Sequence, residues 1–406
     1  MSNDLKTVAP GAATLDRRTC LKALALGAAA LPRRSPGAGS PRAELGTVLE
    51  PVRQKHRLPA LAGAVVQAGR IVAAGVSGVR AQGSPVRATL TDRFHLGSDT
   101  KAMTATLSGM AVESGHLKWE SAIGEVLAVP GMNAQLAAVT LEQLLSHCGG
   151  IPSDTPEMLR LYFNTDAFEY NLTTLRARMI EAWKANAPVS APGKAFHYAN
   201  FGYLLAGAML EKSLGLSWEE LITQRIFDPL KLTSAGLGAQ ATPGRLDAPV
   251  GHQLDDKGNA TPMYWGAGAD IPPALGPAGT AHMSVLDFAA WAGWNAGGGR
   301  RGPLLVKPGT LARIHARHVD TGRIPHPRPG VPAEGAYCMG WGLVKFPWSR
   351  TELLTHNGSN SMNLAKILVD TARDVGVVLV TNFPGDRAED ALNEALPLLY
   401  RPYGTG

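Results

Sequence analysis

Segments with the pattern of β-strands lie near both ends of this 406-residue chain, separated by a long stretch of different character. Near the N-terminus, residues 61–67 and 70–75 are apolar runs around Ala68-Gly69, a dipeptide that favours a tight hairpin. Three more strand candidates follow at residues 353–356, 364–369 and 375–380. We therefore expect an α/β (α+β) fold, with one antiparallel sheet built from both chain ends and flanked by helices.

The long middle of the chain has the periodicity of helices. We expect residues 98–334 to form a large inserted, mainly helical domain, with residues 41–97 and 335–406 forming the sheet domain. Capping patterns mark three expected helix starts: Thr140 with Gln143, Ser217 with Glu220, and Ser284 with Asp287. A closing helix is predicted over about 388–396, ending at Pro397. The cleft between two such domains is the natural place for a binding site.

A serine and a lysine three residues apart follow the strand candidate at residues 91–96. If a helix begins at about Ser98, the side chains of Ser98 and Lys101 share one face of its first turn. The Lys101 amine can then accept the Ser98 proton, provided that burial or a neighbouring cation lowers its pKa. Unpaired N–H groups at a helix start also stabilise a developing oxyanion. This is the layout of an acyl-transfer site.

Such a pair needs a second proton-handling group and a second oxyanion donor, and two downstream segments offer them. Tyr198 and Asn200 stand two residues apart in a loop just before an apolar helix. Near the C-terminus, His356, Gly358 and Ser359 lie at the end of a strand candidate. Glycine at such a position lets a substrate approach the backbone.

With these three segments, the chain resembles the serine β-lactamase and penicillin-binding-protein superfamily, in particular its class C β-lactamase-like branch. That branch includes D-alanyl-D-alanine carboxypeptidases, D-aminopeptidases and esterases. The resemblance covers nearly all of the chain after the leader and implies a β-lactamase/transpeptidase-like fold. It implies these roles: Ser98 as nucleophile, Lys101 as its base partner, Tyr198 as proton shuttle to the leaving group, Asn200 as holder of the acyl-side amide, and the backbone N–H groups of Ser98 and Ser359 as oxyanion hole.

His356 departs from the β-lactamase pattern, because it stands where members of this branch usually carry the lysine of a Lys-Thr-Gly triad. A histidine holds its charge less firmly near neutral pH, which tilts the prediction away from a dedicated β-lactamase. We expect a serine hydrolase that forms an acyl-Ser98 intermediate on ester, D-amino-acid amide or peptidoglycan-like substrates. The expected partner is a small molecule or peptide with an activated or D-configured acyl group. A true class C-type β-lactamase and a non-catalytic penicillin-recognising protein are the alternatives.

Other matches to short patterns carry less weight. Tyr162-Phe163-Asn164 is a second Tyr-x-Asn, but it lacks the loop-to-helix setting. His147 is interpreted as structural, because it ends a helix where a strand edge is needed. The chain has neither a His-x-x-x-His nor a Gly-x-Ser-x-Gly pattern, so neither a zincin-like metal site nor an α/β-hydrolase site is implied. No metal and no cofactor are expected.

Residues 1–34 have the features of an export signal and resemble the twin-arginine type. Arg17-Arg18 precede a short apolar run, and Ala28-Ala29-Ala30 offers a cleavage site. This leader carries a net charge of +4 out of the chain's +6, so the remainder gives no indication of nucleic-acid binding. We expect a periplasmic or exported protein without a stable membrane span after cleavage. Cys148 and Cys338 then remain, and whether they pair is left open.

Overall fold

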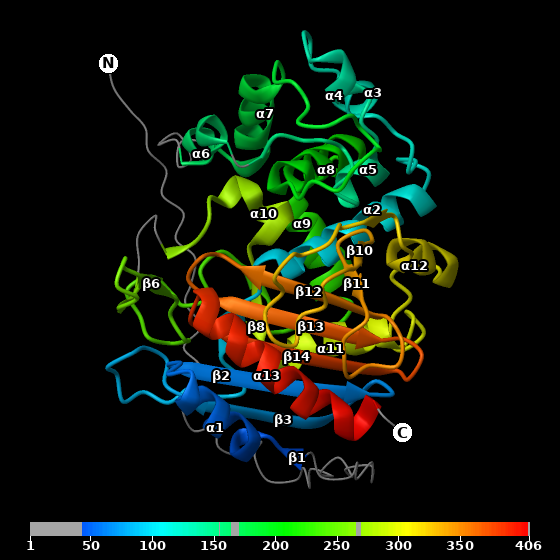
Figure 1. Ribbon diagram of the computed structural model, residues 1–406. Helices are drawn as coiled ribbons and strands as arrows, with labels where there is room; N and C mark the ends of the chain where they lie inside the picture. Colours follow the sequence, from blue (N-terminus) through cyan, green and yellow to red (C-terminus); the bar gives the residue numbers. More distant parts are fainter. Residues whose placement is uncertain (1–42, 154, 164–169, 265–268, 405–406) are drawn as a thin grey trace, which may run out of the picture. The chain divides into compact units, whose positions relative to one another are not determined.

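The computed structural model describes residues 43–153, 155–163, 170–264 and 269–404, so the leader at 1–34 lies outside the described residues. A large sheet has the strand order β1-β3-β2-β14-β13-β12-β11-β10-β9 (Figure 1). Its strands are β1 (Ala43–Glu44), β2 (Ala60–Gln67), β3 (Arg70–Gly78), β9 (Val319–Asp320), β10 (Ala336–Tyr337), β11 (Gly342–Val344), β12 (Leu353–Ser359), β13 (Leu364–Asp370) and β14 (Val375–Thr381). Only the pairing of β1 with β3 is parallel among these strands. The antiparallel sheet expected from both chain ends is confirmed.

The centre of the sheet joins the two ends of the chain. β2 pairs with β14, and Val65 stands opposite Val377. β2 and β3 form the expected hairpin. Ala68 and Gly69 both have a positive φ, 51° and 74°, as a two-residue turn of type I′ requires. The short connection therefore sets the register of β2 and β3, and β14 completes the centre from the other end of the chain.

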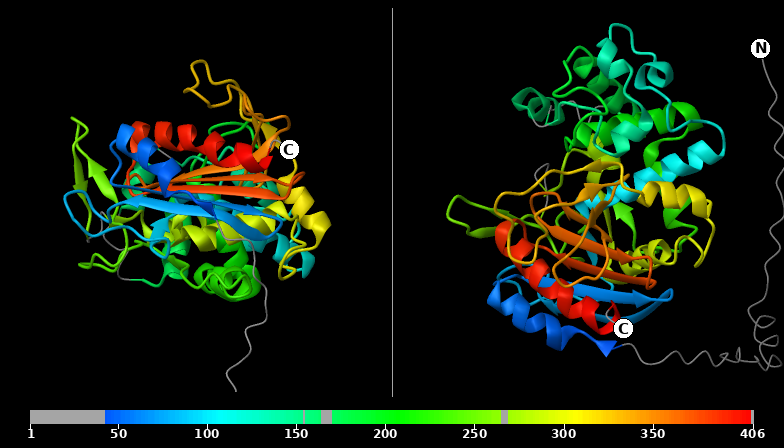
Figure 2. Two further views of the ribbon diagram at one scale, coloured as in Figure 1. Left: turned by 90° about the horizontal axis from the view of Figure 1, so that it is seen from below. Right: turned by 45° about the vertical axis from the view of Figure 1, so that its right-hand side comes forward.

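Helices cover both faces of the large sheet. Neighbouring residues of a strand point to opposite faces, so the sheet has two apolar sides. Val65 lies in a buried cluster with α1 (Gly46–Lys55) and α13 (Gly385–Gly404). Ala64 lies in a second cluster with α11 (Val285–Ala296). Figure 2 shows α1 and α13 on one side of the sheet and α11 on the other.

Helices and two small sheets make up most of the middle of the chain. The helical elements are the 3₁₀ turn η1 (Gly97–Asp99), α2 (Thr100–Glu113), α3 (Ile123–Leu127), α4 (Ala134–Ala137), α5 (Leu141–Leu145), α6 (Pro156–Tyr162), α7 (Leu172–Trp183), α8 (Asn200–Leu214), α9 (Trp218–Ile222), η3 (Thr223–Phe227), η5 (Pro273–Leu275), α10 (Gly276–Gly279) and α12 (Pro308–His315). β4 (Arg93–His95), β8 (Ala281–Ser284) and β5 (Gly236–Leu237) form one small sheet, and β6 (His252–Leu254) and β7 (Ala260–Pro262) form the other. Thr140, Ser217 and Ser284 cap α5, α9 and α11 as expected.

The last helix is longer than expected. α13 continues to Gly404 with Pro397 in its interior, so the predicted end at Pro397 is wrong. A proline costs a helix interior about 3 kcal/mol, because it removes a hydrogen bond and crowds the preceding turn. Beyond it, however, Leu399 and Tyr400 are buried against the sheet. Burying each large side chain contributes roughly 1.5–3 kcal/mol, which is enough to offset the proline.

The expected domain boundaries stay a prediction. The described residues from Ala43 onward belong to one compact unit. Two elements from the stretch 98–334 belong with the large sheet. α11 packs on its face, and β9 pairs with β10 at its edge. Within the residues that the structure describes, no helix has both the length and the apolar character needed to cross a membrane.

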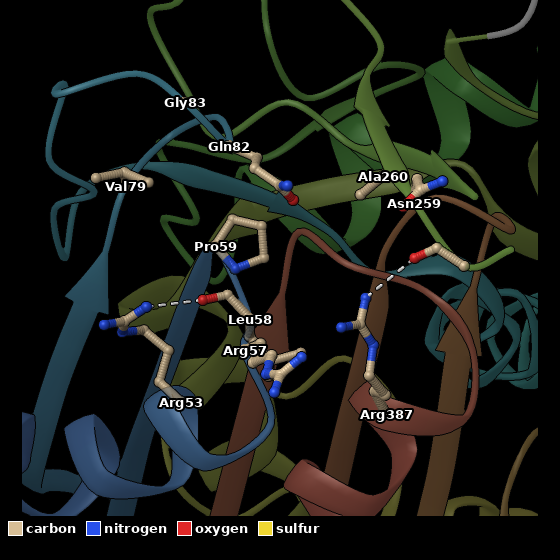
Figure 3. Close-up of a pocket in the computed structure, with 11 residues that line it drawn as sticks. Arg53, Arg57, Leu58, Pro59, Val79, Gln82, Gly83, Asn259, Ala260 and Arg387 are labelled. Carbon is tan, nitrogen blue, oxygen red and sulfur yellow. Dashed lines mark hydrogen bonds between the residues drawn. The ribbon is translucent and has the colours of Figure 1, made fainter. Parts of the chain in front are cut away.

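A cavity of about 480 Å³ lies where α1, the start of β2 and the start of α13 meet (Figure 3). Arg53, Arg57 and Arg387 line it. Arg53 donates to the carbonyl oxygen of Leu58 at 2.8 Å and pairs with Glu50. None of the residues expected in the reaction lines this cavity.

Candidate active site

Ser98 lies in η1, the turn that leads from β4 into α2. Gly97 has a φ of 51°, and a Cβ there would come within 2.3 Å of the backbone nitrogen of Ser359. On β12, a Cβ on Gly358 would lie 1.7 Å from the carbonyl oxygen of Leu96. Glycine at both positions lets the two backbones touch. This contact brings the backbone of Ser359 beside the turn that carries Ser98.

The side chains of Ser98, Lys101 and Tyr198 meet at one point. Lys101 Nζ lies 3.0 Å from Ser98 Oγ, and the Tyr198 hydroxyl donates to the same oxygen at 2.8 Å. Lys101 comes from the first turn of α2, whereas Tyr198 stands just before α8. The structure therefore places two proton-carrying groups in contact with the candidate nucleophile.

Lys101 Nζ is surrounded by acceptors. Besides Ser98, it donates to Asn200 Oδ1 at 2.8 Å and to the carbonyl oxygen of Ala278 at 2.7 Å. The side chain is fully buried, and a buried amine needs such partners. These bonds hold Nζ beside Ser98. Because Asn200 uses its oxygen here, its NH₂ group is the part that can donate to a substrate carbonyl.

His147 holds the loop that carries Tyr198. Its carbonyl oxygen accepts from the His197 N–H at 2.8 Å, and its Nδ1 accepts from the Ala199 N–H at 3.1 Å. The ring centroids of His147 and Tyr198 are 4.3 Å apart. Burial and the charge of Lys101 hold the pKa of His147 well below its usual value, so the ring is neutral and Nδ1 can accept. His147 thus fixes the backbone on both sides of Tyr198.

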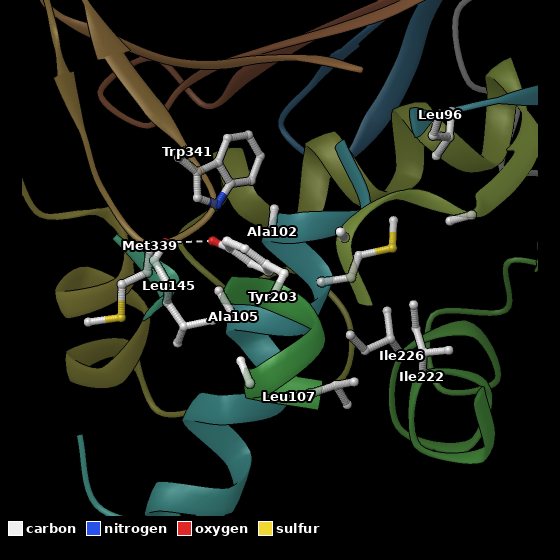
Figure 4. Packing of buried hydrophobic residues seen from close by; sticks show 14 of the residues in the cluster. Leu96, Ala102, Ala105, Leu107, Leu145, Tyr203, Ile222, Ile226, Met339 and Trp341 are labelled. Atoms are coloured by element: carbon white, nitrogen blue, oxygen red, sulfur yellow. Dashed lines mark hydrogen bonds between the residues drawn. The ribbon is translucent and has the colours of Figure 1, made fainter. Parts of the chain in front are cut away.

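The helices behind the site pack into the main hydrophobic core. Figure 4 shows Tyr203 of α8 close to Ala102 and Ala105 of α2. The Tyr203 hydroxyl donates to the carbonyl oxygen of Leu145 at 2.6 Å. Burial raises the pKa of Tyr203 well above its usual value, which keeps this hydroxyl a neutral donor. The candidate site therefore rests on rigid elements rather than on free loops.

A second histidine ties the nucleophile's turn to distant parts of the chain. His95 Nδ1 accepts from the Gly97 N–H at 3.0 Å, and its Nε2 lies 2.9 Å from Asp270 Oδ1. The same carboxylate oxygen accepts from Asn360, just after β12, at 3.0 Å. Sequence reasoning missed Asp270 and Asn360. Their side chains meet only in the folded chain, and neither belongs to a local pattern.

His356 lies in β12, and both of its ring nitrogens have contacts within the protein. Nε2 is 2.9 Å from the Tyr337 hydroxyl. Nδ1 is 2.8 Å from the carbonyl oxygen of Asn357 and 3.5 Å from Asp99 Oδ1. Burial raises the pKa of Asp99 to about 6, and the nearby His356 opposes that shift. Both ring nitrogens of His356 thus have partners within the protein. The expected role of His356 in substrate binding stays a prediction.

The side chain of Ser359 is also used locally. Its hydroxyl donates to the carbonyl oxygen of Asn363 at 2.7 Å and accepts from the Ser361 N–H at 3.0 Å. These bonds close the turn between β12 and β13. What Ser359 can offer a substrate is therefore its backbone N–H.

The remaining candidates lie apart from this cluster. Tyr162 is buried at the end of α6, where its hydroxyl is 3.2 Å from Ser153 Oγ, and Asn164 lies outside the described residues. Cys148 and Cys338 are both buried free thiols, which answers the question that the sequence left open. In the described ranges, no group of three or more His, Cys, Asp or Glu side chains could hold a metal ion.

Comparison with known proteins gives several relatives of low sequence identity. An unguisins hydrolase from Aspergillus violaceofuscus is 26% identical over 341 residues, which are 80% of this chain and 58% of the relative. Penicillin-binding protein 4 from Amycolatopsis lactamdurans is 28% identical over 251 residues, which are 59% of this chain and 60% of the relative. The chain thus spans about three fifths of the length of these curated relatives.

Solved structures share the fold. The octameric penicillin-binding protein homologue from Pyrococcus abyssi has a TM-score of 0.70 at 22% identity, covering 88% of this chain and 77% of its own. A D-stereospecific amidohydrolase from Streptomyces has a TM-score of 0.67 at 18% identity, covering 87% of this chain and 97% of its own. The superfamily and the fold expected from the three motifs are confirmed. The sequence profile of the Beta-lactamase family matches residues 45–400, and the chain belongs to that family.

Proposed function

We propose that this chain is a serine hydrolase that works through an acyl-Ser98 intermediate. The observation that carries the proposal is the contact of Ser98 Oγ with both Lys101 Nζ, at 3.0 Å, and the Tyr198 hydroxyl, at 2.8 Å. A serine hydroxyl is a weak nucleophile until a neighbouring base takes its proton. The neutral form of the Lys101 amine can be that base, and Tyr198 is a second proton-carrying group in contact with the same oxygen.

The reaction proceeds in two stages. In the first, Ser98 Oγ attacks the acyl carbon while its proton passes to the neutral form of the Lys101 amine. The backbone N–H groups of Ser98 and Ser359 stabilise the oxyanion, and losing one such donor typically costs about 10²–10³ in kcat. Tyr198 then delivers a proton to the leaving oxygen or nitrogen as its bond to the acyl carbon breaks. Water attacks the acyl group in the second stage, with the proton transfers reversed, and Ser98 is restored.

We propose esters, D-amino-acid amides or peptidoglycan-like peptides as substrates. The name of the D-stereospecific amidohydrolase supports the D-configured amide among these substrates. The contacts of His356 with Tyr337 and Asp99 also favour this choice, because a β-lactam carboxylate needs a cation with donors to spare. The basic leader at 1–34 supports action after export.

The test is a burst-phase assay with p-nitrophenyl acetate and nitrocefin on the parent protein and on Ser98→Ala. We expect a burst of nitrophenol equal to the enzyme concentration, followed by steady turnover, with both lost in Ser98→Ala. Ser114→Ala is the matched control, because Ser114 ends the same helix and is exposed. It should behave like the parent protein.

Other results of this assay would support other functions. Rapid turnover of nitrocefin supports a class C-type β-lactamase instead. A long-lived adduct without turnover supports a penicillin-recognising protein. Full ester turnover by Ser98→Ala contradicts the acyl-Ser98 mechanism.

A further inference from the structure

The two backbone N–H groups of the proposed oxyanion hole come from turns that are far apart in the chain. Ser98 belongs to the turn η1, and Ser359 ends β12. Both N–H groups must point at the same oxygen of the substrate for the hole to work. A displacement of about 1 Å can cost about 10² in rate. The proposed reaction therefore needs a device that holds the two turns in a fixed relation.

Hydrogen bonds hold both peptide groups of Gly97 in the first turn. The Gly97 N–H donates to His95 Nδ1 at 3.0 Å, and the Gly97 carbonyl oxygen accepts from Thr100 Oγ1 at 2.7 Å. The second of these peptide groups also contains the Ser98 N–H. Gly97 has a φ of 51° and no side chain, so these bonds fix a residue that is otherwise free to turn. His95 therefore helps to direct the Ser98 N–H.

Asp270 selects the form of His95 that can hold Gly97. His95 is completely buried, and its Nδ1 is an acceptor, so the proton of the neutral ring lies on Nε2. Nε2 lies 2.9 Å from Asp270 Oδ1. The negative charge of the carboxylate favours a proton on the ring nitrogen that faces it. Asp270 thus keeps Nδ1 free to accept from the Gly97 N–H.

The same carboxylate oxygen also holds the second turn. Asn360, which directly follows Ser359, donates from Nδ2 to Asp270 Oδ1 at 3.0 Å. Asn360 Oδ1 accepts from the Met362 N–H at 3.2 Å and from Asn363 Nδ2 at 2.9 Å. Asn360 therefore fixes the turn between β12 and β13, and Asp270 fixes Asn360.

The other oxygen of this carboxylate has no such contacts. Asp270 Oδ2 is buried, and among the described residues it has no hydrogen-bond partner. A buried polar atom without a partner destabilises the fold. Such a cost is common where a residue serves activity rather than stability. All the contacts that link the two turns use Oδ1.

We infer that Asp270 and His95 are positioning residues, which keep the N–H groups of Ser98 and Ser359 directed at one oxyanion. The inference rests on the proposed acyl-Ser98 reaction. Asp270 acts through His95 on one turn and through Asn360 on the other. The oxyanion forms only after the substrate is bound, so a change at Asp270 should lower kcat and leave KM nearly unchanged.

The experiment compares Asp270→Ala with Asp270→Asn in the kinetics of p-nitrophenyl acetate. Asp270→Ala removes the shared acceptor, so kcat should fall by about tenfold or more while KM stays within about threefold. Asp270→Asn keeps an oxygen for His95 and Asn360, and its NH₂ group replaces the oxygen that has no partner. It should keep kcat within about threefold of the parent protein, whatever the change in its melting temperature.

Asp370→Ala is the matched control. Asp370 is another buried aspartate, at the end of β13 that is farther from Ser359, and its carboxylate accepts from Tyr400 at 2.6 Å. This variant should lose stability and keep kcat. The inference is overturned if Asp270→Ala keeps the parent kcat, or if its loss of kcat is matched by Asp270→Asn or by Asp370→Ala.

A second variant covers the case in which Asp270→Ala does not fold. Asn360→Ala breaks the same link from the side of the second turn. Its kcat should also fall by about tenfold or more with little change in KM. An unchanged kcat in Asn360→Ala overturns the inference.

Hydrogen exchange separates this inference from the proposed function. Mass spectrometry of peptides covering residues 95–99 and 359–363 follows the two turns, which contain the hydrogen-bonded amides of Gly97 and Met362. In Asp270→Ala, exchange should be faster by about tenfold or more in both segments, because a single carboxylate holds both. Exchange that is unchanged in either segment overturns the inference.

The exchange result does not depend on turnover. If the parent protein hydrolyses no ester above the level of Ser98→Ala, the proposed function fails. Exchange in Asp270→Ala and Asp370→Ala then still decides whether Asp270 holds the two turns together.

Discussion

We expect His147 to set the position of Tyr198 without contacting a substrate. In His147→Leu, the Ala199 N–H loses its acceptor Nδ1 and stays buried. An unsatisfied buried donor costs about 1–3 kcal/mol of folding free energy. Displacement of Tyr198 by about 1 Å lowers kcat by about 10²-fold. KM should change much less, because the Tyr198 hydroxyl acts in proton transfer.

His147→Asn is the matched variant. Asparagine Oδ1 stands at about the same distance from Cβ as histidine Nδ1, so it can still accept from Ala199. The φ of 59° at this position is one that Asn tolerates better than most residues. Urea unfolding and p-nitrophenyl acetate kinetics should therefore show most of the stability and kcat retained in His147→Asn. The reasoning is refuted if Leu and Asn lose the same amounts, or if Leu keeps the parent kcat.

Three further predictions follow from single positions. Gly358→Ala places a Cβ 1.7 Å from the Leu96 carbonyl oxygen, so the backbone of β12 must shift away from Ser98. We expect kcat to fall by about 10²-fold or more. An unchanged kcat would contradict the backbone contact. Asp99 has a folded-state pKa of about 6 against an ordinary 3.8, so the native state binds more protons between these values and loses stability as pH rises through them. Asp99→Asn should therefore be more stable than the parent above pH 6 by up to about 3 kcal/mol, and the difference should vanish below about pH 4. Urea unfolding at several pH values measures it. A difference in stability that does not depend on pH would show that the titration of Asp99 is not its cause. Pro397→Ala should raise the free energy of unfolding by about 2 kcal/mol. This is the roughly 3 kcal/mol penalty of a proline inside a helix, less about 1 kcal/mol for the greater freedom of the unfolded chain. A lower melting temperature would show that α13 needs its proline.

Local patterns were sufficient where the deciding interaction is local. Ala68-Gly69 specifies its turn through the φ values of two residues, and the Thr140 hydroxyl accepts from the N–H of Gln143 three residues on. The end of α13 could not be predicted in this way. Pro397 indicates a stop, but the burial of Leu399 and Tyr400 against a sheet assembled from both chain ends outweighs it.

The candidate site shows the same division. Ser98 and Lys101 are one helical turn apart, so their meeting follows from spacing alone. Tyr198 could be singled out only through its motif, since it approaches Ser98 from another part of the chain. The contact of Asn360 with Asp270 has no local signal at all, because only the folded chain brings the two side chains together.

The central claim is that Ser98 becomes acylated. Rapid quenching of the parent protein during turnover of p-nitrophenyl acetate, followed by intact-mass measurement and peptide mapping, tests it most directly. The account predicts one acetyl group per chain, on the peptide that contains Ser98, and none in Ser98→Ala. An acetyl group on another residue, or steady ester turnover by Ser98→Ala without an adduct, would contradict it.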